Sequence, residues 1–290
     1  MAAIELKNVV KKFKTETVLD DLTLAVEEGE TLVLFGPSGA GKTVLLRLLA
    51  GVIDPEGGTV SLRGHDMEGV APEHRGVGMA FQSFALFPHM SAFDNIASPL
   101  EAGRPGKATI KSGVEKVASL LKIDHVLGHL PRALSNGQKQ RTSLARALSA
   151  KPSILLLDDP LRNVDAKLRF EMRLELPRLL AEQNATVIYV TQDYKEAMAL
   201  GDRIAVLDAG RLTQVGTPAD IYLTPANIEI ARLFGDPTIN LLDVTPESDA
   251  AGLCIRFSDV RVPIQTGLES AVGRDCVAGL RPETVRFVGE

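Results

Sequence analysis

The sequence predicts an α/β fold with a parallel-sheet core, an antiparallel β layer, an inserted helical subdomain and a short C-terminal β domain. Three observations support this prediction. Residues 36–43 carry a G-x-x-x-x-G-K-[ST] pattern between an apolar run and a helical run. Beyond residue 150, buried-type strands alternate with helical segments, which is typical of a parallel sheet covered on both faces. Residues 3–26 alternate apolar and polar side chains in two runs, as antiparallel strands do.

Length, charge and cysteine content limit the possible functions. A chain of 290 residues is long enough for two modest domains. The net charge is −5 with both signs interspersed, which disfavours nucleic acid as a partner. Cys254 and Cys276 are too few for a disulfide framework and lack metal-ligand spacing. No apolar run approaches the roughly 18 residues of a membrane span, and the N-terminus does not read as a signal peptide, so we expect any membrane role to be peripheral.

The N-terminal half begins with strands and a helix. The apolar run at 31–35 leads into the glycine-rich pattern, and a helix over 44–50 ends at Gly51. A turn at 55–58 precedes a strand at 59–62. Another apolar run, 77–81, ends at Gln82.

A helical period follows. It begins at Ser83, predicts a subdomain over about 84–150, and finishes in a helix opened by Ser135. Next, the run 154–159 predicts a buried strand that carries Asp158 and Asp159 at its C-terminal tip.

The remaining chain completes the sheet and forms a second domain. A helix is expected over about 166–182, a strand over 185–191 and a closing hairpin near 203–210. Short helices run to Phe234, and the turn at 235–237 suggests domains over 1–236 and 237–290.

The glycine-rich pattern predicts a loop that binds nucleotide phosphates. Glycines let successive backbone N–H groups turn toward an anion, and the helix that follows adds its positive N-terminal end. Lys42 is expected to neutralise the β- and γ-phosphates, and Thr43 to hold Mg²⁺. The full set of loop residues is Gly36, Pro37, Ser38, Gly39, Ala40, Gly41, Lys42 and Thr43.

Three further segments make the sequence resemble the ATP-binding subunit of an ABC transporter. They are Gln82, Leu134–Arg141 and Leu155–Asp159. The resemblance implies a RecA-like P-loop core. Residues 81–90 are similar to the glutamine-loop region of the branch that imports sugars, polyols and related solutes. Gly279–Glu283 is similar to part of that branch's C-terminal regulatory domain, which is longer in the family, so here it is expected to be shortened.

The resemblance implies a dimer in which each ATP lies between the phosphate loop of one subunit and the signature segment of the other. It implies that Phe13 stacks on adenine, although an aromatic residue in a half-buried strand could equally be core. Gln82 and Asp158 would bind Mg²⁺, and Asp165 would contact the opposite site. The segment expected to cap the γ-phosphate of the partner comprises Ser135, Asn136, Gly137 and Gln138.

The resemblance also implies partners and a location. Membrane permease subunits would insert a coupling helix near residues 84–90, and a solute-binding protein would act indirectly. The subunit would lie on the cytoplasmic face of the membrane.

Three residues and one loop depart from the family pattern. Asp159 stands where a Glu usually polarises the attacking water, and its oxygens lie about 1 Å further back. Gln192 replaces a His that contacts the γ-phosphate, and an amide cannot become cationic. Asn136 replaces the first glycine of the usual LSGGQ, and the loop 162–165 departs from Ser-Ala-Leu-Asp.

These departures predict a site that binds ATP but hydrolyses it slowly, working beside a second, intact ATPase subunit in a heterodimer. Asp159, Gln192, Gln82 and Lys42 are the candidate catalytic residues. The alternative is that Asp and Gln substitute adequately and that the dimer is a homodimer. A regulatory subunit without useful hydrolysis, and a soluble ABC-type ATPase not linked to transport, are two further functions compatible with these motifs.

Overall fold

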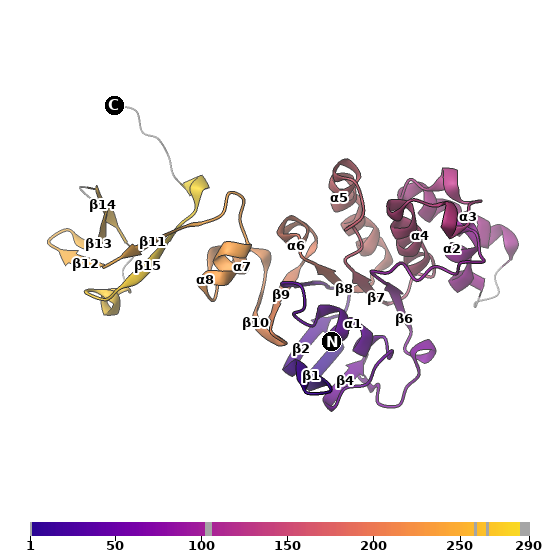
Figure 1. The fold of residues 1–290 in the computed structure, drawn as a ribbon, viewed down its shortest axis with the longest axis horizontal. Coiled ribbons are helices and arrows are strands. Elements are labelled where there is room, and N and C mark those ends of the chain that lie inside the picture. The colour runs from indigo at the N-terminus through magenta and orange to yellow at the C-terminus, as the bar shows by residue number, and fades with distance from the viewer. Residues whose placement is uncertain (1, 102–105, 258–259, 265–266, 285–290) are drawn as a thin grey trace. The chain divides into compact units, whose positions relative to one another are not determined.

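The computed structural model describes residues 2–101, 106–257, 260–264 and 267–284 (Figure 1). The contacts of the chain divide it into two units, Met1–Ile221 and Tyr222–Glu290, and each is described by itself. The predicted domain boundary after residue 236 stays a prediction. The helix α7, Pro218–Leu223, crosses the limit between the two units.

A six-stranded sheet forms the centre of the first unit, in the order β10-β9-β3-β8-β7-β6. All neighbouring strands are parallel except the β9–β10 hairpin. Every residue of β3, β7 and β8 is buried, which is why these strands are continuous apolar runs. The strands are β3 Thr31–Phe35, β6 Val77–Ala80, β7 Ile154–Asp158, β8 Thr186–Thr191, β9 Arg203–Asp208 and β10 Arg211–Gly216.

The antiparallel layer is a separate four-stranded sheet in the order β2-β1-β4-β5. Its strands are β1 Ala2–Phe13, β2 Glu16–Glu27, β4 Gly57–Leu62 and β5 His65–Asp66. The helix α1, Lys42–Leu49, shares one apolar core with both sheets, whereas α5 and α6 lie on the other side of the parallel strands (Figure 1). The predicted P-loop α/β fold is confirmed, and its core fixes the start of α1 at the carboxyl end of β3.

The inserted segment is helical, but its first helix begins later than expected. Residues 81–91 form turns and irregular backbone, and Phe84 and Ala85 have φ of 66° and 47°. Such positive φ values are incompatible with a right-handed helix, so the expectation of helical structure from Ser83 is wrong for this stretch. The helices are α2 Ala92–Glu101, α3 Lys107–Leu120 and α4 Asn136–Ser149.

Two further helices complete the first unit, and short elements build the second. The former are α5 Ala166–Gln183 and α6 Tyr194–Leu200. The second unit contains α8 Ile228–Leu233 and two small sheets, of which one pairs β11 Asn240–Val244 with β15 Cys276–Leu280. The other is formed by β12 Glu247–Asp249, β13 Gly252–Phe257 and β14 Val260–Pro263.

Short 3₁₀ turns occur at Pro72–His74, Asp124–Val126, Pro131–Ala133, Glu269–Ala271 and Pro282–Thr284. Within the described residues, no helix combines the length and apolarity needed to cross a bilayer.

Candidate functional site

The glycine-rich loop joins β3 to α1, and its shape depends on two of its glycines. A Cβ on Gly36 would lie 2.1 Å from the carbonyl oxygen of Leu207. Gly41 has φ 105°, and a Cβ there would lie 2.8 Å from the Val18 oxygen. Both contacts are with backbone atoms that cannot move aside. Only glycine therefore fits at these positions, and the N–H groups at the start of α1 stay open to an anion.

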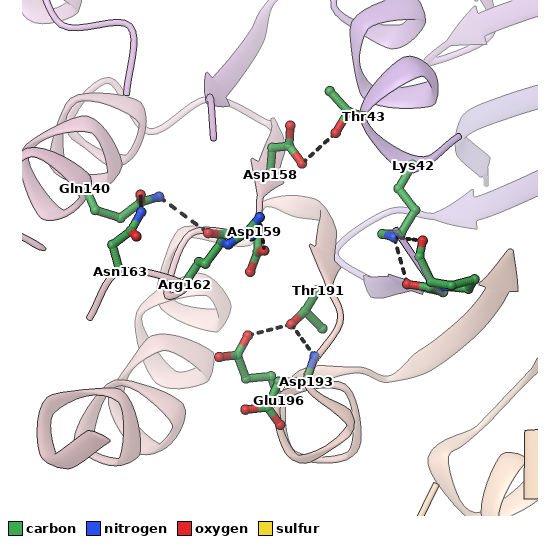
Figure 2. A network of polar contacts seen from close by, with 12 residues as sticks. Lys42, Thr43, Gln140, Asp158, Asp159, Arg162, Asn163, Thr191, Asp193 and Glu196 are labelled. Atoms are coloured by element: carbon green, nitrogen blue, oxygen red, sulfur yellow. Dashed lines mark hydrogen bonds and ion pairs between the residues drawn. The ribbon is translucent and has the colours of Figure 1, made fainter. Parts of the chain in front are cut away.

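Lys42 is held against its own loop. Its ammonium donates hydrogen bonds to the carbonyl oxygens of Gly36 at 2.7 Å and Pro37 at 2.6 Å, as Figure 2 shows. The side chain is buried, and burial lowers the pKa of Lys42, while Asp159 and Asp158 act in the opposite direction. The loop therefore carries a positive charge that is already positioned beside its backbone.

Thr43 and Asp158 face each other at the carboxyl end of β7. The Thr43 hydroxyl donates to Asp158 Oδ1 at 3.2 Å (Figure 2). Burial raises the pKa of Asp158, and the hydrogen bond from Thr43 opposes that rise. A hydroxyl and a carboxylate are oxygen ligands of the kind Mg²⁺ takes, and Mg²⁺ usually keeps several waters and binds substrate phosphates as well. The two side chains fit such an ion.

Asp159 lies directly after β7 in a left-handed conformation, with φ 51°. Its N–H donates to the Val190 oxygen at 3.0 Å, which ties this residue to the end of β8. Burial raises the pKa of the Asp159 carboxyl, and the nearby Arg162 opposes the rise. Aspartate tolerates a left-handed backbone better than most residues do, so the structure can hold this carboxyl in place.

A pocket of about 180 Å³ brings the predicted catalytic residues together. Gln82 and Gln192 reach it from the segments after β6 and β8. Among the predicted site residues, those that line the pocket are Ser38, Gly39, Gly41, Lys42, Thr43, Gln82, Asp158, Asp159 and Gln192. The arrangement is a phosphate-binding loop with two carboxylates and two amides facing it.

Comparison with known proteins identifies this arrangement. The family model for ABC transporters matches residues 19–162. The trehalose/maltose import ATP-binding protein MalK of Thermococcus litoralis is 41% identical over 98% of this chain and 78% of its own length. The chain belongs to the ABC transporter family. The predicted ATP-binding subunit, with the activity of an ATP hydrolase, is thereby confirmed.

Two other similar proteins bear on the branch and the fold. The spermidine/putrescine import ATP-binding protein PotA of Pseudomonas aeruginosa is 43% identical over 98% of this chain and 78% of its own length. The dimeric post-hydrolysis structure of the ATP-binding cassette MJ0796, bound to ADP and Pi, is 28% identical with a TM-score of 0.70. The two structures superpose over 74% of this ABC ATPase and 98% of the MJ0796 chain.

Phe13 lies outside the pocket lining. The residue is 45% exposed at the end of β1, and the Lys11 ammonium lies 5.1 Å from the ring centroid. The alternative that Phe13 is a core residue is wrong, because the ring remains open to solvent. Adenine stacking by this ABC ATPase stays a prediction.

The signature segment forms a capped start of α4. The Ser135 hydroxyl accepts from the Gln138 N–H at 3.3 Å, and Gln138 Oε1 accepts from the Ser135 N–H at 2.9 Å. This reciprocal pair is a capping box. Asn136 is the first helical residue, and neither it nor Gly137 lines the pocket of its own chain. Asp165 caps α5, accepting from the Leu168 N–H at 3.0 Å.

Gln140 is a structural contact of the site that the sequence analysis missed. It is 1% exposed, and its amide donates to the Asp159 carbonyl at 3.4 Å while accepting from Asn163 Nδ2 at 3.2 Å (Figure 2). Gln140 thus links α4 to the loop after β7. The sequence did offer one signal that Gln140 is buried, because it lies four residues before the apolar Leu144 and therefore on the same helix face.

Glu196 supports the segment that carries Gln192 and was also missed. Its carboxyl is buried and accepts from the Tyr189 hydroxyl at 2.9 Å and the Thr191 hydroxyl at 2.8 Å. The Thr191 hydroxyl in turn accepts from the Asp193 N–H at 3.0 Å (Figure 2). Burial raises the pKa of Glu196, with the two hydroxyl hydrogen bonds opposing the rise. Hydrogen bonds therefore hold Thr191 and Asp193, the residues on both sides of Gln192, in place.

Proposed function

We propose that this chain is the ATP-binding subunit of an importer that couples Mg·ATP binding and hydrolysis to uptake of a small solute through membrane permease subunits. The observation that carries the proposal is the convergence of Lys42, Thr43, Asp158 and Asp159 on one pocket in a chain of the ABC family. The relatives named above are import ATP-binding proteins, which favours an importer over a soluble ATPase.

The phosphate-binding part of the site acts through charge and position. The N–H groups of Ser38–Thr43 surround the phosphates, and Lys42 offsets charge on the β- and γ-phosphates. Thr43, Asp158 and Gln82 would hold Mg²⁺, which supplies charge neutralisation for the phosphates when bound.

The hydrolytic part of the site must place a water in line with the γ-phosphate. Asp159 is the residue that would polarise the water, and Gln82 and Gln192 would orient it and the phosphate by hydrogen bonding. The Asp159 side chain is one methylene shorter than Glu, so the water is held less closely to its line of attack. A displacement of about 1 Å can lower a rate by about 100-fold.

Slow hydrolysis in this pocket favours a heterodimer with a second, intact ATPase subunit. The signature residues Ser135–Gln138 would then cap the nucleotide of that subunit. A homodimer with adequate catalysis by Asp159 and Gln192 is the competing arrangement, and a purely regulatory subunit is the third.

Contact with permeases is expected on the cytoplasmic face of the membrane, near residues 84–90. Phe87 is 43% exposed there, and the Arg146 guanidinium lies 5.4 Å from the centroid of its ring. This exposed aromatic residue offers a coupling helix an apolar contact, as the resemblance implies.

The solute is proposed to be a sugar or polyol and to reach the permeases from a solute-binding protein. Polyamine import is a second candidate, because PotA matches this chain at 43% identity. Uptake of radiolabelled maltose, sorbitol and spermidine by cells with and without the gene separates the two. Loss of spermidine uptake alone would overturn the sugar assignment.

The degenerate-site proposal is tested by ATPase activity of the purified chain, its Asp159→Glu/Gln192→His variant and its permease complex. We expect weak activity of the wild-type chain and an increase of about tenfold in the double variant, because the carboxyl regains its reach and a chargeable group faces the phosphate. Robust turnover by the wild-type chain alone would refute slow hydrolysis. ATP binding with no gain in the double variant would place the shortfall in Asn136 or in a missing partner.

A further inference from the structure

Arg162 is a cation in the nucleotide pocket that none of the assignments above uses. It lies in the loop between β7 and α5 and lines the same pocket as Lys42 and Gln192. The loop is anchored, because the Arg162 N–H donates to the Asp159 carbonyl at 3.3 Å and the Arg162 carbonyl accepts from Arg169 at 3.0 Å. The backbone is therefore fixed while the guanidinium extends toward the pocket.

The Arg162 guanidinium has only a weak ion pair with Asp159. Its NH1 lies 3.8 Å from Asp159 Oδ2, which is too long for a hydrogen bond, and the side chain is 55% exposed. Exposed ion pairs of this kind contribute little to stability. Arg162 can therefore leave Asp159 at small cost when a stronger anion enters the pocket.

A triphosphate in this pocket carries more negative charge than Lys42 alone offsets, so a second cation would stabilise it. Lys42 lies at the phosphate loop and is bound to the Gly36 and Pro37 carbonyls. On the opposite side, Gln192 is an uncharged amide. A guanidinium binds phosphate oxygens through two parallel hydrogen bonds, which an amide cannot match.

We propose that Arg162 recognises the terminal phosphate of ATP, moving from Asp159 to the phosphate and supplying in the same chain the positive charge that Gln192 lacks. The proposal rests on the proposed ATP-binding function and adds a residue that makes the site prefer a triphosphate to a diphosphate. ADP lacks the terminal phosphate and leaves Arg162 paired with Asp159. The contact also frees the Asp159 carboxyl to face the attacking water.

The test measures binding of ATP and ADP, with Mg²⁺, to the full chain and its Arg162→Ser, Arg162→Gln and Arg162→Lys variants by calorimetry. We expect Arg162→Ser and Arg162→Gln to weaken ATP binding about tenfold and ADP binding less than twofold, because one charge-assisted contact is lost. Arg162→Lys should recover part of the ATP affinity, since it keeps the charge without the planar fork.

Arg178→Ser is the matched control. Arg178 also pairs with an acid three residues earlier, Glu175, at 3.8 Å, and is 77% exposed on α5, outside the nucleotide pocket. It should leave both affinities unchanged. A thermal melt of each variant checks folding, and the Lys variant keeps the test decisive if the Ser variant is unstable.

Each outcome distinguishes this inference from the proposed function. If the wild-type chain fails to bind ATP, the proposed function fails. If it binds ATP, and Arg162→Ser binds ATP as tightly as wild type or loses ATP and ADP affinity equally, the proposed function stands and the role of Arg162 is refuted.

Discussion

The two sides of the nucleotide pocket differ in how closely they follow the family pattern. The phosphate loop matches that pattern at every specified position, and its Lys42 is fixed by two backbone carbonyls. The opposite side carries Asp159 and Gln192, with Arg162 loosely paired beside them. In the function proposed above, the first side would bind phosphates through backbone groups, whereas the second would place one water. We therefore expect nucleotide binding and hydrolysis to be separable properties of this chain.

Replacing Lys42 gives the largest expected effect. Lys42→Ala should lower kcat/KM for ATP by about 1,000-fold, because it removes charge stabilisation from both the bound and the reacting phosphates. Steady-state ATPase kinetics of the permease complex measure this, with Lys116→Ala on α3 as a control that keeps its activity. Equal loss in both variants would mean that the effect is not specific to the loop.

Replacing Asp159 should lower the rate of hydrolysis without weakening ATP binding. Asp159→Asn should lower kcat by about 100-fold, the low end for a general base. ATP affinity should change less than twofold, since the phosphate loop is untouched. Single-turnover kinetics and calorimetry measure the two quantities separately. A parallel loss of ATP affinity would contradict the separation of binding from hydrolysis.

Replacing Glu196, which holds the residues on both sides of Gln192, should affect the stability of the fold more than ATP binding. Glu196→Ala leaves the Tyr189 and Thr191 hydroxyls without their buried acceptor and should cost about 2 kcal/mol of unfolding free energy. Glu196→Gln keeps an acceptor and should cost less. Urea unfolding measures both. Equal costs would contradict this, because Gln keeps the side-chain volume and an acceptor that Ala lacks, so neither packing nor a neutral acceptor would then replace any of the carboxyl's contribution.

The contribution of Glu196 to stability should also depend on pH. The pKa of Glu196 in the folded protein is raised above its ordinary value of 4.5. Protonation of this group therefore favours folding, and its contribution is complete below about pH 4.5 and declines as pH rises toward the folded pKa. The stability advantage of wild type over Glu196→Gln should shrink in that window. An advantage that grows with pH would contradict the sign of the shift.

The smallest expected effect is at the signature segment. Ser135→Ala removes one half of the capping box and should cost about 1 kcal/mol of unfolding free energy. ATP affinity of the isolated chain should not change, because Ser135 does not line its own pocket. If the isolated chain lost ATP affinity, Ser135 would contribute to the nucleotide pocket of its own chain, which would contradict its assignment to the partner's site.

The sequence was sufficient for the parts of the structure that short-range chemistry dictates. The phosphate loop, the two carboxylates at the carboxyl end of β7 and the alternating strands and helices all follow from local patterns. The irregular stretch at residues 81–91 was missed because its positive φ values at Phe84 and Ala85 depend on contacts with α4, where Ser143 and Arg146 donate to their carbonyls. Gln140 was missed because its partners, Asp159 and Asn163, belong to a loop far along the chain. Glu196 was missed although Tyr189 and Thr191 are close in sequence, because only the turn from β8 into α6 brings its carboxyl back to their hydroxyls.

The contact of Gln140 has a consequence for communication within the subunit. One buried amide touches both ends of a short loop, the Asp159 carbonyl and the Asn163 side chain, and belongs to the helix that presents Ser135. A second tight point lies nearby, because a Cβ on Gly137 would meet the Asn163 carbonyl oxygen at 2.9 Å. The start of α4 and the loop that carries Asp159 are thus connected by direct contacts within one chain. In the dimer proposed above, a shift of α4 would therefore also displace the backbone of Asp159.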